Sequence, residues 1–177
     1  NLEEGKQFFL GFANVINAMR TCSKIIIGRI QGKAVGGGVG LAAACDYCFA
    51  TEQASVKLSE LSIGIGPFVI EPVVKRKIGL AAFAELTLNA TNWQTAYWAK
   101  GKGLYAAVFE TIKELDVEVE NLAQKLSMYN PEALLELKKV LWDGTENWKE
   151  LLEQRAEISG KLVLSEFTKK ALQKYKK

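Results

Sequence analysis

The spacing of apolar positions changes along the chain from helical to strand-like and back again. Helical spacing in the first twenty residues predicts an amphipathic helix over residues 4–20. A β-branched run predicts a buried strand over Ile25–Ile30, and similar runs predict strands over Tyr47–Thr51 and near Val56. The small apolar run Leu41–Ala44 predicts a tightly packed helix between the first two strands. The first third of the chain is therefore predicted to be α/β.

Beyond residue 60 the pattern is helical almost throughout, and a strand is expected only at Leu104–Phe109. The expected helices cover residues 68–78 (ended by Gly79), 80–88, 93–100, 116–129 (capped by Asp116), 131–142, 146–164 and 165–175. An α/β half followed by a helical half argues against a simple doubly wound sheet. We expect an α/β core over residues 1–110 and a helical region over residues 111–177.

Composition places the chain among globular proteins, because 49% of its 177 residues are hydrophobic and 24% are charged. Its net charge of +3 is small, and no segment interleaves basic and aromatic residues, so nucleic acid is not an expected partner. No apolar stretch reaches the roughly 20 residues that span a bilayer. Three cysteines give no disulfide framework and no signal peptide is evident, which favours a reducing cytoplasm.

The chain contains no histidine, and this restricts the chemistry it can perform. Ser-His-Asp and Cys-His nucleophiles and histidine-based metal sites are excluded. Acid–base catalysis must then come from Glu, Asp, Lys, Tyr or Cys side chains or from the backbone. The chain opens at Asn1 within a helical pattern, and we expect an N-terminal part of the fold to be absent from it.

The strongest functional signal is a glycine cluster, Gly36–Gly38 and Gly40, between the first strand and the small helix. Glycines allow the backbone to approach a ligand closely, and the first N–H groups of a helix are unpaired and carry the positive end of its dipole. The cluster therefore predicts a backbone receptor for an anion or oxyanion. Glu60, in an apolar and Gly-rich setting, is either a general acid/base with a raised pKa or an ordinary loop carboxylate.

Two other motifs allow different interpretations. Gly38-x-Gly40-x-x-Ala43 matches the dinucleotide fingerprint, but it lies too far behind the strand, and Asp46 follows too soon to be the ribose ligand. Close helix packing is another use for these glycines. Cys45 and Cys48 form a C-x-x-C pair where a helix runs into a strand, which favours structural thiols over a redox pair.

Three motifs in order carry a resemblance to a known family: residues 30–38, IQGKAVGGG; Leu41-Ala42 with Cys45-Asp46; and residues 58–64, LSELSIG, with Pro67. Together they resemble the crotonase (enoyl-CoA hydratase/isomerase) family, and the methylglutaconyl-CoA hydratases in particular. The similarity is greatest over residues 24–79. It implies a spiral of ββα units followed by a helical C-terminal region that forms trimers, or dimers of trimers.

The resemblance also implies chemistry on acyl-CoA thioesters. The N–H of Gly37 corresponds to one oxyanion donor, and the other belongs to a segment N-terminal to this chain. Glu60 corresponds to the catalytic carboxylate. The substrate would be bound by residues around them: Gly36, Gly38, Gly40, Pro67 and Phe68. No metal or redox cofactor is implied, and coenzyme A arrives as part of the substrate.

The sequence departs from the family pattern at Gly40, which takes the place of a second catalytic glutamate in many hydratases. Hydration of an enoyl-CoA is the expected reaction. Isomerisation by Glu60 alone is an alternative, as is a non-catalytic oligomer that binds acyl-CoA. Phe68 stands where a small residue is usual, which indicates a reshaped acyl pocket.

Overall fold

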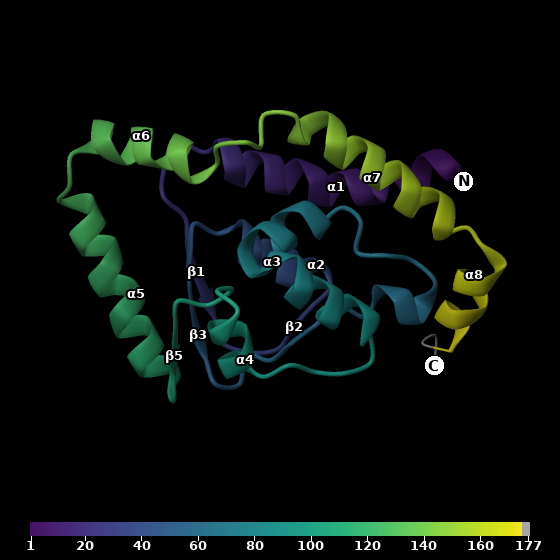
Figure 1. Cartoon of the computed structure of the whole chain (residues 1–177), viewed down its shortest axis with the longest axis horizontal. Helices are drawn as coiled ribbons and strands as arrows, with labels where there is room; N and C mark the ends of the chain where they lie inside the picture. Colours follow the sequence, from purple (N-terminus) through teal and green to yellow (C-terminus); the bar gives the residue numbers. More distant parts are fainter. Residues whose placement is uncertain (175–177) are drawn as a thin grey trace.

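The computed structural model describes residues 1–174, and its strands form two small parallel sheets (Figure 1). The first sheet has the order β1 (Ile27–Ile30), β3 (Tyr47–Thr51) and β5 (Ala107–Phe109). The second pairs β2 (Ala34–Val35) with β4 (Val56–Lys57). The predicted strands at Tyr47–Thr51 and Val56 are confirmed. The strand β2 was not predicted.

The strands and helices repeat as ββα units. In the first unit β1 and β2 lead to α2 (Gly37–Ala44). In the second, β3 adds beside β1 and β4 adds beside β2, and the chain continues into the 3₁₀ turn η1 (Glu60–Ile63) and α3 (Glu71–Leu88). Each unit thus contributes one strand to each sheet, and the predicted spiral of ββα units is confirmed.

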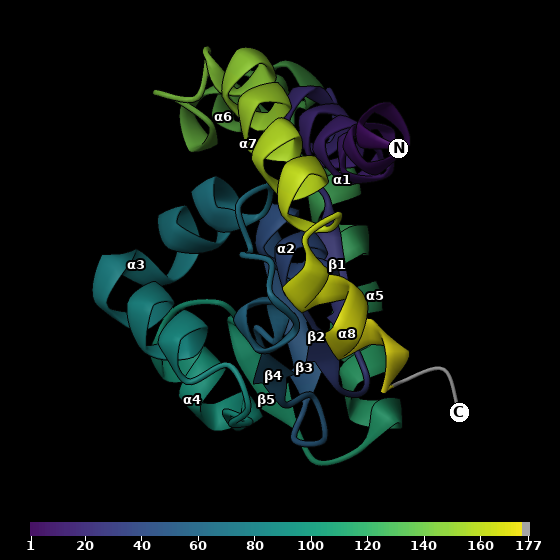
Figure 2. The ribbon, with the colours of Figure 1, turned by 90° about the vertical axis from the view of Figure 1, so that its right-hand side faces the viewer.

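Helix α2 lies in the core, which explains its composition. Its residues Ala42, Ala43 and Ala44 are at most 1% exposed. Because these side chains are small, α2 packs closely against α3, α1 and β2. The sheet β1-β3-β5 is covered on one side by α5 (Ile112–Ser127), while α3 and α4 (Ala96–Gly101) lie on the other side of the strands (Figure 2). The position of α2 is therefore fixed from several directions.

The last helices fold back onto the first part of the chain. Helix α7 (Trp148–Leu162) runs beside α1 (Leu2–Thr21) along one edge of the molecule (Figure 1). A glycine contact brings their backbones together, since a Cβ on Gly160 would lie 2.7 Å from the backbone nitrogen of Lys6. Helix α6 (Pro131–Leu141) connects α5 to this layer, and α8 (Glu166–Gln173) packs on η1.

Several predicted boundaries move, each for a local reason. The cap of helix α5 is Thr111, five residues before the predicted cap Asp116, because Thr111 and Glu114 form a reciprocal capping box. Asp116 instead pairs with Arg29 on β1. Helix α4 begins after the cap Thr95 rather than at residue 93.

Other boundary predictions have different outcomes. The break at Gly79 is confirmed, since its φ of 78° and ψ of 164° are not helical. Residues 68–70 precede α3, although a helix was predicted from Phe68. The end of the last predicted helix, at Tyr175, lies outside the described residues. The division into residues 1–110 and 111–177 stays a prediction. Within residues 1–174, no helix is both long enough and apolar enough to cross a membrane.

Candidate active site

Glu60 is the first residue of η1, and only Leu58 and Ser59 separate it from β4. The turn is closed by Gly64, whose φ of 86° is left-handed and whose N–H donates to the carbonyl of Glu60. Helix α8 packs over this turn, because a Cβ on Gly64 would meet Phe167 and Thr168. The backbone that carries Glu60 is thus fixed by β4, which precedes it in the chain, and by α8, which packs on η1.

The Glu60 carboxylate lies against the glycine turn before α2. Gly36 has a φ of 53° and a ψ of −118°, a conformation that residues with a Cβ rarely adopt. A Cβ at this position would lie 2.7 Å from Oε1 of Glu60. The N–H of Gly36 is already used, since it donates to the carbonyl of Lys57. Gly36 therefore permits the approach of Glu60 and is not itself a free donor.

Burial raises the pKa of the Glu60 carboxyl above its ordinary value, although its own backbone N–H partly opposes the shift. The residue is half-buried, and its Oε2 atom is fully buried without a hydrogen-bond partner among residues 1–174. Desolvation is the larger of these two effects. A carboxyl of this kind accepts and returns protons closer to neutral pH than an exposed one does.

Gly37 begins α2, so its N–H has no acceptor within the helix. The N–H groups of Val39 and Gly40 donate to the carbonyl of Gly36, which leaves the donors of Gly37 and Gly38 at the open end of the helix. The ring of Phe12, from α1, lies against the Cα of Gly37 where a Cβ would otherwise stand. This gives one wall of the site an aromatic cover.

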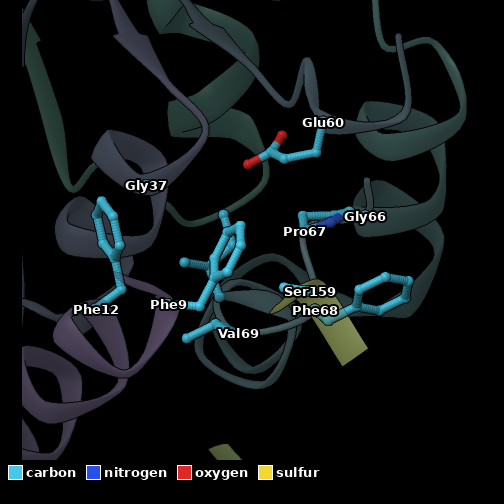
Figure 3. A pocket seen from close by; sticks show the side chains of 10 residues that line it. Phe9, Phe12, Gly37, Glu60, Gly66, Pro67, Phe68, Val69 and Ser159 are labelled. Atoms are coloured by element: carbon cyan, nitrogen blue, oxygen red, sulfur yellow. The ribbon is translucent and has the colours of Figure 1, made fainter. Parts of the chain in front are cut away.

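One pocket of about 60 Å³ joins Glu60 to Gly37. Figure 3 shows the Glu60 carboxylate reaching into the space between Gly37 and Pro67. The lining comes from α1, α2, η1, the loop before α3, and α7: Phe9, Phe12, Gly37, Glu60, Gly66, Pro67, Phe68, Val69, Ile70 and Ser159. The structure thus brings together Gly37, Glu60, Pro67 and Phe68, four of the residues that the sequence selected.

Gly38 and Gly40 lie elsewhere. Gly38 is exposed and faces Ala34, and Gly40 is buried under Ile70, whose side chain fills the space of a Cβ there. A side chain at position 40 could not enter the pocket without moving Ile70. The dinucleotide interpretation is wrong, because Gly38 is inside α2 and is separated from β1 by β2, whereas the fingerprint needs a glycine where the strand ends.

Sequence reasoning missed six residues of the pocket: Phe9, Phe12, Gly66, Val69, Ile70 and Ser159. Phe9 and Phe12 belong to the apolar stripe of α1, and this spacing cannot distinguish a core position from a pocket wall. Ser159 lies on α7, where its neighbours predicted only helix packing. A serine on the apolar face of a helix was the available signal.

The second conspicuous cluster surrounds Asp46, at the other end of α2. Its carboxylate accepts hydrogen bonds from the backbone N–H of Ile26 (2.7 Å), from Nζ of Lys138 (2.6 Å) and from Nε1 of Trp142 (2.7 Å). The side chains of Asp46 and Lys138 are only 2% and 4% exposed. The cluster ties α6 to the core, and we assign it a structural role.

The thiols beside Asp46 are also placed for packing. Cys45 and Cys48 are both buried and unbridged. Hydrogen bonding to Cys45 and burial raise the pKa of the Cys48 thiol, which disfavours the reactive thiolate. In the part of the chain that the structure describes, no group of three or more His, Cys, Asp or Glu side chains could hold a metal ion.

Replacing Gly36 with alanine tests the contact between the glycine turn and Glu60. The new Cβ would strain a positive-φ position and press on Oε1, so we expect the free energy of unfolding to fall by about 1–3 kcal/mol. Gly32→Ala is the matched control, because nothing lies within 4 Å of its Cβ position. Chemical denaturation of both variants checks this. Equal stability of the two would contradict the described turn.

Comparison with known proteins agrees with the motifs. The family described as Enoyl-CoA hydratase/isomerase matches residues 2–177. A peroxisomal Delta(3,5)-Delta(2,4)-dienoyl-CoA isomerase of Arabidopsis thaliana is 33% identical over 135 residues, which is 74% of this chain and 47% of the relative. An enoyl-CoA hydratase of Alternaria alternata is 32% identical over 133 residues, again 74% of this chain and 44% of the relative. The chain thus spans less than half of these relatives.

Solved structures share the fold. An enoyl-CoA hydratase from Mycobacterium avium superposes with a TM-score of 0.87 at 24% identity, over 98% of this chain and 68% of that protein. An enoyl-CoA hydratase from Bacillus halodurans gives a TM-score of 0.84 at 26% identity, over 94% and 66%. With the family match over nearly the whole sequence, these findings show that the chain belongs to the enoyl-CoA hydratase/isomerase (crotonase) family.

Proposed function

We propose that the protein hydrates an enoyl-CoA thioester through an oxyanion-stabilised enolate. The observation that carries the proposal is the pocket that Gly37 and Glu60 share. The open N–H at the start of α2 is suited to the thioester oxygen as it gains charge, and such preorganised donors are worth about 3 kcal/mol each. Glu60, with its raised pKa, exchanges protons with the acyl chain.

The remaining pocket residues would bind the acyl group. Pro67 and Phe68 form the wall opposite Gly37, and the ring of Phe68 folds back onto Gly66, where it leaves no space for a Cβ. Coenzyme A is part of the substrate, and no further cofactor is proposed. Membership of the family does not identify the acyl group. The resemblance to methylglutaconyl-CoA hydratases therefore stays a proposal.

Isomerisation of an enoyl-CoA is the second candidate. Ile70 covers Gly40, the position at which many hydratases carry a second glutamate, so Glu60 is the only carboxylate that lines the pocket among the described residues. A single base that moves a proton between two carbons is sufficient for isomerisation. One relative is named a dienoyl-CoA isomerase.

Incubation with crotonyl-CoA and with a 3-enoyl-CoA in heavy water, followed by mass spectrometry, separates the two candidates. Formation of 3-hydroxyacyl-CoA supports hydration. Double-bond migration with deuterium uptake and no added water supports isomerisation instead. A protein that binds acyl-CoA without converting either substrate would favour the non-catalytic alternative.

We also propose that the helical region assembles the protein into a trimer or a dimer of trimers. Large apolar side chains on and between α5 and α6 remain exposed in the single chain: Met128, Tyr129, Leu137, Val140 and Leu141. Exposed apolar patches of this kind are typical of interfaces. Light scattering after gel filtration tests this, and a monomer would contradict it. A cytoplasmic location stays a prediction.

A further inference from the structure

We propose that the ring of Phe9, on α1, closes the far end of the acyl pocket, so that the protein favours short-chain acyl-CoA thioesters. The inference deepens the proposed function, because it names the length of the acyl group that the same pocket takes. It rests on that proposal in one respect, namely that the acyl group lies beside Gly37 and Glu60. Phe9 is then a specificity-determining residue and moves no proton.

The first observation is the place of the Phe9 ring. Figure 3 shows the ring in the middle of the pocket, beside Pro67 and below the carboxylate of Glu60. Val69 and Ser159 lie on the other side of the ring from that carboxylate, and all five residues line the same pocket. An acyl chain that starts beside Glu60 therefore meets the Phe9 ring before it reaches Val69 or Ser159.

The second observation is that the pocket is small and apolar. Its volume of about 60 Å³ is several times less than the roughly 300–1,000 Å³ of sites for drug-sized ligands. Among the described residues that line it, only Glu60 and Ser159 have polar side chains, and Oγ of Ser159 is buried. A space of this size and character suits the few carbons of a short acyl group.

The Phe9 ring is held in place by the packing of α1. Gly5 lies one turn before Phe9 on the same face of the helix. A Cβ on Gly5 would lie 3.0 Å from the carbonyl oxygen of Gly160 on α7, so the two backbones are already in contact there. The ring of Phe8 packs edge-on against Phe9, with centroids 5.2 Å apart. A wall supported in this way is suited to setting a length.

A longer acyl chain gains nothing from this pocket. Each methylene that is buried in apolar space raises affinity about fourfold. The further methylenes of a longer chain must either stay in water, where they gain no burial, or displace a packed ring, which strains its neighbours. Removal of the Phe9 ring would open apolar space toward Val69. The length preference should then change in a direction that can be measured.

Phe9→Ala tests the inference in the protein purified as it occurs naturally. Isothermal titration calorimetry with butyryl-CoA and octanoyl-CoA measures binding alone, because these saturated thioesters cannot be hydrated or isomerised. The parent should bind butyryl-CoA at least as tightly as octanoyl-CoA. Phe9→Ala should bind octanoyl-CoA at least about tenfold more tightly than butyryl-CoA, since the added methylenes are fewer than the carbons of the missing ring. The specificity ratio kcat/KM for 2-octenoyl-CoA over crotonyl-CoA should rise in parallel.

Phe8→Ala is the matched control. Phe8 is the preceding residue of α1 and touches the Phe9 ring, but it is 66% exposed and does not line the pocket. Its length preference should equal that of the parent. Phe9→Leu keeps an apolar side chain on the core and should give an intermediate preference, which tests the inference if Phe9→Ala does not fold. Circular dichroism establishes which variants are folded.

The outcomes separate this inference from the proposed function. A parent that binds octanoyl-CoA ten times more tightly than butyryl-CoA overturns the role of Phe9. The same holds if folded Phe9→Ala or Phe9→Leu keeps the parental length preference, even where the parent hydrates crotonyl-CoA. If the parent converts no enoyl-CoA but Phe9→Ala changes the length preference in binding as expected, hydration fails and the role of Phe9 stands.

Discussion

Replacing Glu60 with glutamine is expected to lower kcat by about 10²–10⁴-fold, for hydration and isomerisation alike. Glutamine keeps the shape of the side chain and its place against Gly36, but it cannot take or return a proton. KM should change little, because the acyl group and the thioester oxygen keep their contacts. Steady-state kinetics with crotonyl-CoA and a 3-enoyl-CoA measure both effects.

The same substitution should change the dependence on pH. In the parent, kcat should rise with pH through an inflection above 4.5, the ordinary value for glutamate, because burial raises the pKa of Glu60. The folded protein keeps the Glu60 proton to higher pH than the unfolded chain does. Stability is therefore lost as pH rises from the ordinary value through the raised one. Glu60→Gln removes this loss, so at neutral pH the variant should be more stable than the parent.

Glu150→Gln is the control, since it removes an exposed carboxylate of α7 that does not line the pocket. Its kinetics and thermal unfolding should match those of the parent. If Glu60→Gln turned over both substrates at the parental rate, Glu60 would not be the acid/base and the proposed function would fail.

Asp46→Asn should cause the largest loss of stability. The asparagine preserves the size of the side chain, but the buried ammonium of Lys138 loses its countercharge. Breaking a buried ion pair from one side typically costs about 3–5 kcal/mol. For a chain of this size that corresponds to a fall in Tm of about 6–20 °C. Calorimetry or circular dichroism during heating measures the change.

Helix α6 offers a matched control for this prediction. Glu136 and Lys139 form an exposed pair on the same helix, with side chains 67% and 63% exposed. Glu136→Gln should change the free energy of unfolding by no more than about 1 kcal/mol. The double variant Asp46→Asn, Lys138→Met should recover part of the loss. Equal effects of Asp46→Asn and Glu136→Gln would show that the cluster does not hold α6 to the core.

Local patterns in the sequence predicted much of this fold. The β-branched runs located β1 and β3, the small residues after the glycines located α2, and Gly79 marked the break in α3. These predictions depend on contacts between neighbours in the chain. Asp116 was mistaken for a helix cap because Thr111, with Glu114, provides a better one a few residues earlier.

The site was predicted only in part, because some of its residues are brought together only by tertiary packing. Gly37 and Glu60 belong to recognisable motifs, and the structure places them on one pocket. Phe12 and Ser159 have no motif, because they line the pocket only through the packing of α1 and α7. The burial of Gly40 by Ile70 likewise depends on the path of the loop before α3. Tertiary contacts of this kind leave no periodic pattern in the sequence.

The glycine contact between α1 and α7 can form only late in the synthesis of the chain. Gly5 and Gly160 are separated by most of the chain, and the pocket has walls from both helices. During synthesis the α/β units emerge first and can begin to pack, but this wall must wait until α7 leaves the ribosome. Closing so long a loop is slow. The nascent chain would therefore expose Phe9 and Phe12 to solvent and to chaperones until α7 has been synthesised.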